Sequence, residues 1–503
     1  MLDRRSFLRP RSAPRRPGGL APFEPSPDQP WNEARARHLL RRTTYGVHRP
    51  DVDALLALSP AEAVDLIIDG ALARPPLDRP DWLAMRRYPA SATTAEKQAF
   101  EDANRAASEA FGLTVYNRLL GDAQTDRAAR LGESFLERLT VFWSNRYVTE
   151  TNAYRFAWWL FDYRDTLRRN ALGSVATAVH EIGTTGAMLR YLNGDDNRKE
   201  APNENYAREL LELFTMGITG PDGTPNYTQS DVTEIARALT GWRLAPWQDE
   251  DVYFDARRFD DGDKTLLGET GAFGYDDVVP ILFRNRPIPI AHHVATALYR
   301  EFVSLEVDAD VVADLARRLV AAEFQVAPVL RTLLASSHFF EATHMGALIK
   351  SPTELLVGAA RTWGRTAYAL DDAKRANYQA KTLDQDLFSP PDVKGWRGGR
   401  DWINTSTITE RAKLMRGEVW RARDAIIADA RARDSAFDAR ALAAGLYEEL
   451  LLRPPEASAL DDLTEVLLQG TPAYAWDPTT DGGGNRIRSY VAHLVSLPDF
   501  QLR

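Results

Sequence analysis

The sequence predicts a mostly α, multi-helical protein, and three observations support this fold class. Apolar residues recur at helical spacing over long stretches, as Leu131 and Phe135 do. Capping residues mark helix starts, as Ser59 does before Pro60, which the first turn of a helix tolerates. Only one run, residues 252–254, is identified as a candidate strand.

The remaining elements are predicted in order along the chain. Helices are expected at residues 34–42, 93–120, 125–143, 203–217, 228–241, 291–302, 309–322, 326–336, 352–368, 374–383, 407–433 and 446–454. Residues 149–198 also have a helical pattern, and their aromatic cluster is predicted to form a wall of the core. Residues 243–290 are rich in Gly and Asp, which predicts a long, ordered, loop-rich insertion in which a small hairpin is one option.

These patterns divide the chain into successive parts. Residues 1–30 carry many Arg and Pro and few apolar residues, so they are expected to form a disordered basic arm. Residues 31–242 form an N-terminal helical part with the central motif, and residues 243–290 form the insertion. Residues 291–433 form a helical part with a Gly- and Trp-rich loop, and residues 434–503 form a small C-terminal helical unit.

Composition limits the partners of the protein. Its 503 residues are enough for two or three hydrophobic cores. The net charge of −9 argues against a basic nucleic-acid-binding surface, so no nucleic-acid partner is expected. Cysteine is absent, which excludes disulfides, thiolate metal sites and a cysteine nucleophile. No apolar run approaches the ~18 residues that span a bilayer, so no membrane span is expected.

Arg4 and Arg5 stand in a stretch that looks like a twin-arginine export signal. Such a signal needs an apolar stretch behind it, and here the following residues are basic and Pro-rich. Two interpretations remain open. The protein is cytoplasmic and the arm does not drive export, which we favour, or the motif functions and the protein is periplasmic or otherwise exported.

The densest group of polar residues lies on the predicted helix 203–217. Asn203 is its expected N-cap, and Gly217 is its expected C-terminal stop. Successive residues of an α-helix are rotated by about 100°, which separates a polar face from an apolar face. The polar face carries Glu204, Asn205, Arg208, Glu209 and Glu212.

A second helix follows, with Thr228 as its expected N-cap and Asp231 three residues later in a capping-box pattern. If the two helices form a hairpin, Glu209 and Glu212 are expected where they meet, near an arginine. Clustered carboxylates suit general acid–base catalysis or a hard cation, and they equally suit an ion-pair network. The catalytic candidates are Glu204, Arg208, Glu209, Glu212, Asp231 and Arg237.

Two loops supply candidate ligand contacts. Asp260, Asp261 and Asp263 could hold Ca²⁺ or Mg²⁺, or simply form a solvated turn, and no other cofactor is expected. The Gly- and Trp-rich loop offers flat aromatic faces for a sugar, unless its tryptophans are packed into the helical core. The binding candidates are Trp242, Lys264, Trp396, Arg400, Trp402 and Asn404.

Several separated motifs resemble the bacterial domain-of-unknown-function-1800 family. They lie at residues 203–217, 227–231, 236–242, 260–268, 390–396 and 402–406, and the resemblance runs from about His38 to the C-terminus. It implies histidines near Trp143 and before the Asp-Asp-Gly loop, where this chain has Ser144-Asn145-Arg146 and Arg258-Phe259. Any metal-dependent activity of relatives is therefore in doubt here. The resemblance also implies a protein partner from a sulfatase-like companion family encoded nearby.

Two functional classes follow from these observations. The first is a non-catalytic or weakly catalytic helical binding or assembly protein that acts with the neighbouring partner in a cell-envelope or polysaccharide-related process. The alternative is a hydrolytic or carbohydrate-active enzyme that uses the clustered carboxylates with an optional divalent cation. The missing histidines favour the first class.

Overall fold

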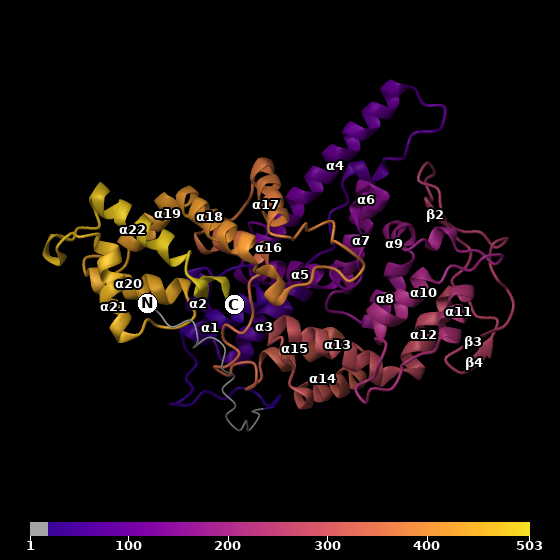
Figure 1. Ribbon diagram of the computed structural model, residues 1–503, viewed down its shortest axis with the longest axis horizontal. Helices are drawn as coiled ribbons and strands as arrows, with labels where there is room; N and C mark the ends of the chain where they lie inside the picture. Colours follow the sequence, from indigo (N-terminus) through magenta and orange to yellow (C-terminus); the bar gives the residue numbers. More distant parts are fainter. Residues whose placement is uncertain (1–18) are drawn as a thin grey trace.

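The computed structural model describes residues 19–503, and this part of the chain is mostly α-helical, as predicted (Figure 1). Residues 1–18, which include Arg4 and Arg5, lie outside the described residues. The C-terminal helices gather at one end of the molecule, the short strands lie at the opposite end, and one long helix projects from the body (Figure 1). Within the described residues, no helix is both long enough and apolar enough to cross a membrane.

The first half of the chain contains α1 (Glu33–Thr43), α2 (Arg49–Leu56), α3 (Pro60–Leu72), η2 (Asp81–Ala84), α4 (Thr94–Leu120), α5 (Arg127–Ser144), α6 (Thr151–Tyr154), α7 (Ala157–Asn170), α8 (Val175–Gly183), α9 (Gly186–Tyr191), η3 (Gly194–Asp196), α10 (Asn205–Glu209), η4 (Leu210–Thr215) and α11 (Gln229–Ala238). The insertion contains β1 (Trp242–Leu244), β2 (Val252–Phe254), β3 (Lys264–Leu266), β4 (Glu269–Gly271) and α12 (Tyr275–Asn285). The second half contains α13 (Pro287–Phe302), α14 (Ala309–Ala321), α15 (Val326–Leu334), α16 (Pro352–Thr362), α17 (Leu370–Thr382), η5 (Gly399–Trp402), α18 (Thr405–Arg421), α19 (Arg423–Arg431), α20 (Ala439–Leu450), α21 (Ala457–Leu468), η6 (Ala473–Ala475), α22 (Asp481–Leu494) and η7 (Pro498–Gln501).

Local sequence signals explain where several helices begin and end. Thr93 caps α4 in a capping box with Glu96, and Gly121 ends the helix in the left-handed conformation at φ +105°. Ser59 caps α3 in the same way, with Pro60 in the first turn, as the sequence predicts. Thr228 and Asp231 form the predicted capping box of α11.

Two hydrophobic cores form, and α16 belongs to both. Val357 and Ala360 pack into the large core, which is built mainly from α1 to α15. Leu355 and Leu356, on the other side of α16, pack into a smaller core with α18 to α22. The second core therefore extends beyond the expected unit at residues 434–503, because α16, α18 and α19 also contribute apolar faces to it.

The insertion is ordered, as the sequence predicts. Its strands form two antiparallel hairpins, β1–β2 with Trp242 opposite Phe254, and β3–β4 with Lys264 opposite Gly271. The expectation that loop structure continues to residue 290 is wrong, because α12 fills residues 275–285. Its first turn is closed by Asp277, which accepts a hydrogen bond from the backbone N–H of Gly274 at 2.9 Å.

The central helix departs from the predicted α-helix. It begins as the short α10 and continues as a π-helix, η4, over Leu210–Thr215. The Thr215 hydroxyl donates to the Leu210 carbonyl at 2.6 Å, and the Gly217 N–H donates to the Leu211 carbonyl at 3.1 Å. Gly217 ends the helix at φ +74°, as predicted, whereas the N-cap is Glu204 rather than Asn203. A π-helix turns less per residue than an α-helix, but the predicted faces remain distinct: Tyr206, Leu210 and Phe214 are buried, whereas the polar residues from Glu204 to Glu212 are partly exposed.

Residues 19–30 belong to the arm that was expected to be disordered, but part of this segment packs against the body. Leu20 and Phe23 are buried. The Phe23 N–H donates to the Ala335 carbonyl at 2.8 Å, and its ring lies 4.9 Å from that of Phe340. Two buried apolar side chains and a backbone pairing are enough to order a segment whose overall composition is polar.

Candidate functional site

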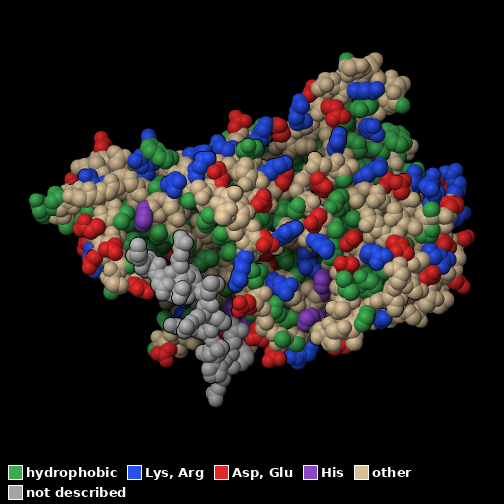
Figure 2. Space-filling model, viewed as in Figure 1, with side chains coloured by type: hydrophobic (Ala, Val, Ile, Leu, Met, Phe, Trp, Pro, Cys, Tyr) green, Lys and Arg blue, Asp and Glu red, His purple; other side chains and the backbone are tan. Residues whose placement is uncertain are grey.

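A cavity of about 430 Å³ lies between α5, α13, the start of α16 and the Gly- and Trp-rich loop at residues 389–404. Its charged lining consists of Arg138, Arg146, Arg300, Glu301, Glu354, Lys394, Arg397 and Arg503. Lys and Arg side chains gather around the middle of the molecular face in Figure 2, over the region of α5 and α13 in Figure 1. Six cations against two glutamates make the cavity positive in a chain whose net charge is −9.

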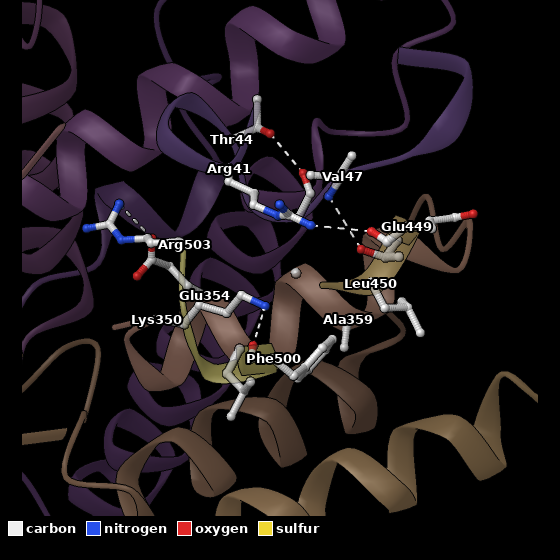
Figure 3. Close-up of a pocket in the computed structure, with 14 residues that line it drawn as sticks. Arg41, Thr44, Val47, Lys350, Glu354, Ala359, Glu449, Leu450, Phe500 and Arg503 are labelled. Atoms are coloured by element: carbon white, nitrogen blue, oxygen red, sulfur yellow. Dashed lines mark hydrogen bonds and ion pairs between the residues drawn. The ribbon is translucent and has the colours of Figure 1, made fainter. Parts of the chain in front are cut away.

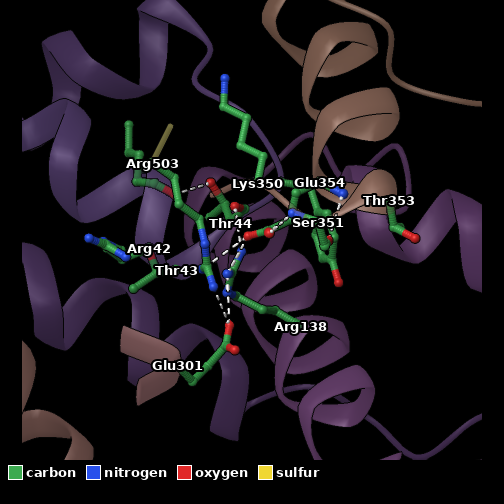
Figure 4. Close-up of polar contacts among 12 residues, drawn as sticks. Arg42, Thr43, Thr44, Arg138, Glu301, Lys350, Ser351, Thr353, Glu354 and Arg503 are labelled. Atoms are coloured by element: carbon green, nitrogen blue, oxygen red, sulfur yellow. Dashed lines mark hydrogen bonds and ion pairs between the residues drawn. The ribbon is translucent and has the colours of Figure 1, made fainter. Parts of the chain in front are cut away.

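Two arginines and two glutamates form a compact ion-pair cluster in one wall (Figure 4). Arg138 reaches Glu301 at 2.8 Å and also contacts Glu354. Arg503 reaches Glu301 at 3.1 Å and Glu354 at 3.0 Å. Glu354 also accepts a hydrogen bond from the Ser351 N–H at 2.7 Å, which closes the first turn of α16. The cluster therefore joins α5, α13, α16 and Arg503.

Glu301 is the titrating group of this cluster. Burial, assisted by the negative charge of Glu354, raises the pKa of Glu301 to about 7, although Arg138 opposes the shift. The side chain keeps 24% of its surface exposed, so its carboxyl can exchange protons with solvent in the cavity. A carboxyl that titrates near neutral pH can hold or release a proton under physiological conditions.

The other four cations, Arg146, Arg300, Lys394 and Arg397, have no ion-pair partner within 4.0 Å among the described residues. Arg146 is the most enclosed of them, and its buried Nε has no hydrogen-bond partner. Burial lowers the pKa of Arg146, which means that its charge is poorly solvated. The buried Thr296 hydroxyl in the same cavity also has no partner.

The π-helix contacts the cavity wall through one carbonyl. Leu213 accepts hydrogen bonds from Arg146 Nη2 at 3.4 Å and from His293 Nε2 at 3.1 Å. Burial lowers the pKa of His293 to about 3, so its imidazole is neutral and must donate through Nε2 to this carbonyl. Leu213 lies in the last turn of η4, where helix carbonyls lack a partner in their own helix and are free to accept from side chains.

A second, smaller pocket of about 40 Å³ adjoins the cavity and shares Glu354 and Arg503 with it (Figure 3). Lys350 points into it, donates from Nζ to the Phe500 carbonyl at 2.6 Å and lies 3.9 Å from the centre of the Phe500 ring. Burial lowers the pKa of Lys350 well below its usual value. The space is sufficient for a few water molecules and too small for a larger ligand.

The predicted carboxylate cluster is distributed over separate contacts. Glu204 pairs with Arg208 at 2.8 Å and accepts hydrogen bonds from Gln229 and Thr233 of α11, so it joins the two central helices. Among the described residues, neither Glu209 nor Glu212 forms an ion pair within 4.0 Å with Arg208 or Arg237. Burial and the charge of Glu212 raise the pKa of Glu209, and the charges of Lys394 and Arg208 oppose this shift.

Arg237 instead anchors the Asp-Asp-Gly loop. It pairs with Glu234 at 2.9 Å and with Asp260 at 2.8 Å, and its Nη1 donates to the Asp263 carbonyl at 3.1 Å. The neighbouring carboxylate of Asp231 accepts a hydrogen bond from the Leu267 N–H at 3.1 Å. These acidic side chains of α11 therefore hold the β3–β4 hairpin in place.

The three aspartates of this loop do not belong to the group of converging metal-ligand atoms found among the described residues. Both carboxylate oxygens of Asp260 accept hydrogen bonds from Arg237, while Asp261 and Asp263 point into solvent as exposed residues. Lys264 is buried, donates to the Asp260 carbonyl and lies 4.7 Å from the Phe259 ring centre. Among the described residues, the atoms that converge as metal ligands belong to a different group, His338, Glu341 and His344.

The predicted binding residues of the Gly- and Trp-rich loop are mostly used within the fold. Trp396 and Trp402 border the cavity but are 4% and 7% exposed, so little of their ring faces is available for stacking on a sugar. The Asn404 side chain caps α18 by accepting from the N–H groups of Ser406 and Thr407. Arg400 is exposed, and Trp242 packs edge-on against Phe254 and Tyr275 in the insertion.

The family model described as "Protein of unknown function (DUF1800)" matches residues 38–502. The chain belongs to the DUF1800 family. The match covers nearly the whole chain and every cavity residue except Arg503, which confirms the resemblance seen in the sequence. A search of curated proteins and a search of solved structures returned no match.

Residues in the two neighbourhoods where the DUF1800 resemblance implies histidines have structural contacts here. Asn145 lines the cavity and forms hydrogen bonds with both backbone groups of Trp396, at 2.6 Å and 3.3 Å. The Arg258 carbonyl accepts from the Lys199 N–H at 2.8 Å. In this DUF1800 chain, Asn145 therefore positions the loop that closes the cavity.

Sequence reasoning missed most of the cavity. Lys394 lies in a recognised motif, and Arg146 follows the Trp143 stretch, but Arg138, Arg300, Glu301 and Arg503 stood in no motif. Their separation along the chain, from residue 138 to residue 503, leaves no spacing that could have linked them.

Proposed function

We propose that this protein is a non-catalytic or weakly catalytic binding protein whose cavity holds an anionic group, and that it acts together with a partner protein. The observation that supports this proposal is the set of four cavity cations without ion-pair partners among the described residues: Arg146, Arg300, Lys394 and Arg397. Like charges that line one cavity repel one another, and an anion that enters the cavity relieves this repulsion.

The chemistry of the lining favours an oxyanion. An arginine guanidinium presents several N–H donors in a fixed plane, which suits sulfate, phosphate or carboxylate oxygens. The Nε of Arg146 and the hydroxyl of Thr296 are buried polar atoms without a partner, and both border the cavity. A buried polar group without a hydrogen bond costs about 1–3 kcal/mol, so a ligand that draws these side chains into hydrogen bonds offsets part of this cost.

We infer a sulfated or carboxylated carbohydrate as the ligand class. A volume of about 430 Å³ accommodates a sugar ring with its charged substituent. A cell-envelope or polysaccharide-related process and a partner from the sulfatase-like companion family are consistent with such a ligand. Because the tryptophan faces are mostly covered, recognition is expected to depend on charge rather than on stacking.

Calorimetric titration tests the proposal. A sulfated hexasaccharide is expected to bind, its desulfated counterpart is not, and the affinity should fall as salt is added. The exposed cavity residues Arg300 and Lys394 are each changed to Gln, with Arg453→Gln as the matched control on an exposed arginine outside the cavity. Each cavity variant is expected to weaken binding about tenfold, or ~1.4 kcal/mol. Equal binding of both sugars, or an equal loss in the control, contradicts the proposal.

The enzymatic alternative is supported by a single observation, the raised pKa of Glu301 inside a positive cavity. A carboxyl with a pKa near 7 suits a general acid for glycosidic or ester hydrolysis. In this alternative the active carboxylates are Glu301 and Glu354 rather than those of the central helices. New reducing ends released from a sulfated polysaccharide, and lost in Glu301→Gln without loss of binding, would establish the enzyme and replace our proposal.

A further inference from the structure

His338, Glu341 and His344 bring one ligand atom each within 4.8 Å of one another. Both histidines are almost fully buried, whereas Glu341 keeps 27% of its side chain exposed. Two of the separations involve the carboxylate, 3.5 Å from Oε1 to His338 Nδ1 and 3.7 Å from Oε2 to His344 Nε2. Two donors bound at ~2.0–2.1 Å to a tetrahedral Zn²⁺ lie about 3.4 Å apart, so these two separations are close to the zinc geometry, and donor atoms up to 4.8 Å apart must move closer when the metal binds.

Backbone turns place the three side chains on one side of the segment. The Glu341 N–H donates to the His338 carbonyl at 3.3 Å, and the His344 N–H donates to the Glu341 carbonyl at 3.0 Å. Two successive turns of this kind repeat every three residues, which aligns positions i, i+3 and i+6. The same spacing on an α-helix would spread the outer pair by about 120° around the axis.

A residue outside the segment orients the first histidine. The hydroxyl of Tyr299, on α13, lies 3.0 Å from His338 Nε2. This contact uses the ring nitrogen that points away from Glu341 and leaves Nδ1 on the side of the carboxylate. Metal-bound histidines usually form such a hydrogen bond through their second nitrogen, because it fixes the tautomer and the ring orientation.

We infer that His338, Glu341 and His344 bind one divalent transition-metal ion of the Zn²⁺ class as a structural site. Two imidazoles and a carboxylate suit Zn²⁺ better than Ca²⁺ or Mg²⁺, which prefer oxygen ligands. Solvent at the exposed side of Glu341 can supply the fourth ligand. The site lies apart from the Asp-Asp-Gly loop and differs in metal class from the cation considered there.

The position of the cluster indicates what the metal does. The Arg42 guanidinium of α1 donates to the His344 carbonyl at 2.6 Å, and the His338 N–H donates to the Gly19 carbonyl at 3.3 Å. A metal here fixes the point where residues 19–23, α1, α13 and residues 336–344 meet. The segment continues directly to Leu348 and Ile349, which line the basic cavity, so the metal stiffens one cavity wall.

Zinc titration of the chelator-treated full chain tests this inference. We expect one equivalent of Zn²⁺ to bind and to raise the melting temperature, and Co²⁺ to give a visible absorption spectrum of low-symmetry coordination. Glu341→Gln and His344→Gln should each weaken zinc binding at least about 100-fold, and Tyr299→Phe about 10-fold or more. His493→Gln, on an exposed histidine of α22, is the matched control and should leave zinc affinity unchanged.

Extended X-ray absorption fine structure at the zinc edge identifies the ligands in the wild-type protein. This measurement does not depend on whether any variant folds. Two imidazoles and oxygen donors around zinc are expected. Zinc affinity equal in wild type and Glu341→Gln overturns the inference, as does a zinc site without imidazole scattering. Failure of this site leaves the anion-binding proposal untouched, since sugar titrations of the metal-free protein measure the latter separately.

Discussion

Asn145 holds Trp396 in place through two backbone hydrogen bonds: its Oδ1 accepts from the Trp396 N–H at 2.6 Å, and its Nδ2 donates to the Trp396 carbonyl at 3.3 Å. The preceding Gly395 has φ +79°, and a Cβ added there would lie 2.1 Å from Asn145 Oδ1. One amide side chain at the end of α5 thus fastens the Gly- and Trp-rich loop over the cavity.

Asn145→Ala is therefore expected to destabilise the protein and to loosen this loop. The change leaves the Trp396 N–H without its partner, which costs about 1–3 kcal/mol in a buried setting. Urea denaturation measures the loss, and sugar titration should show weaker binding as the loop residue Lys394 becomes mobile. Asn152→Ala, on an exposed asparagine, serves as control and should stay within about 0.5 kcal/mol of wild type. Equal stability of the two variants would contradict the assigned role of Asn145.

A buried ion-pair network joins α4, α5 and α7. Arg168 reaches Glu137 and Glu133 at 2.9 Å, and Arg118 reaches Glu133 at 2.9 Å. Removal of one partner leaves a buried charge uncompensated, so Glu133→Gln should cost about 3–5 kcal/mol. The exposed pair of Arg440 and Asp461 is the comparison, and Asp461→Asn should cost about 1 kcal/mol or less. Equilibrium urea unfolding distinguishes the two, and a small loss in Glu133→Gln would show that the network is dispensable.

Glu209→Gln is expected to leave the melting temperature unchanged or to raise it. The pKa of Glu209 is raised in the folded protein by burial and by the charge of Glu212. A carboxyl with a raised folded pKa favours the folded state only while it is protonated, so its ionisation lowers stability as pH rises above the unfolded value of about 4.3. The advantage of the variant should therefore be larger at pH 7 than at pH 4. A lower melting temperature at pH 7 would instead indicate a structural ion pair.

Anion binding in the cavity is expected to tighten as pH falls from about 8 to 6, across the pKa of Glu301 at about 7. Protonation removes a negative charge next to the bound anion, and the bound anion in turn raises the pKa of Glu301. Titrations of the sulfated hexasaccharide in buffers with different ionisation enthalpies should therefore detect proton uptake at pH 7. Glu301→Gln should bind with little pH dependence over this range. Binding that tightens as pH rises would exclude this role for Glu301.

The fold class and many helix boundaries could be predicted because they depend on local signals. Capping pairs such as Thr228 with Asp231 act within one turn, and the left-handed conformation of Gly217 depends on its own missing Cβ. The family motifs were equally visible along the chain. The π-helical turn over Leu210–Thr215 was not visible in the sequence, because no capping or spacing signal marks it, and the contacts of its Leu213 carbonyl with Arg146 and His293 come from distant parts of the chain.

The sequence by itself determined that the protein is helical and belongs to the DUF1800 family. It also determined where many helices end and that acidic residues outnumber basic ones. Only the tertiary structure decided which charges meet. Arg237 could have paired with Glu209, but the packing of the β3–β4 hairpin on α11 brings Asp260 to it instead. In the cavity wall, Arg138 and Arg503 contact the same glutamate although they are far apart in the sequence. The histidine cluster likewise requires two tight turns next to Tyr299 of another helix. Electrostatic and metal sites depend on distances in space, which local propensity does not encode.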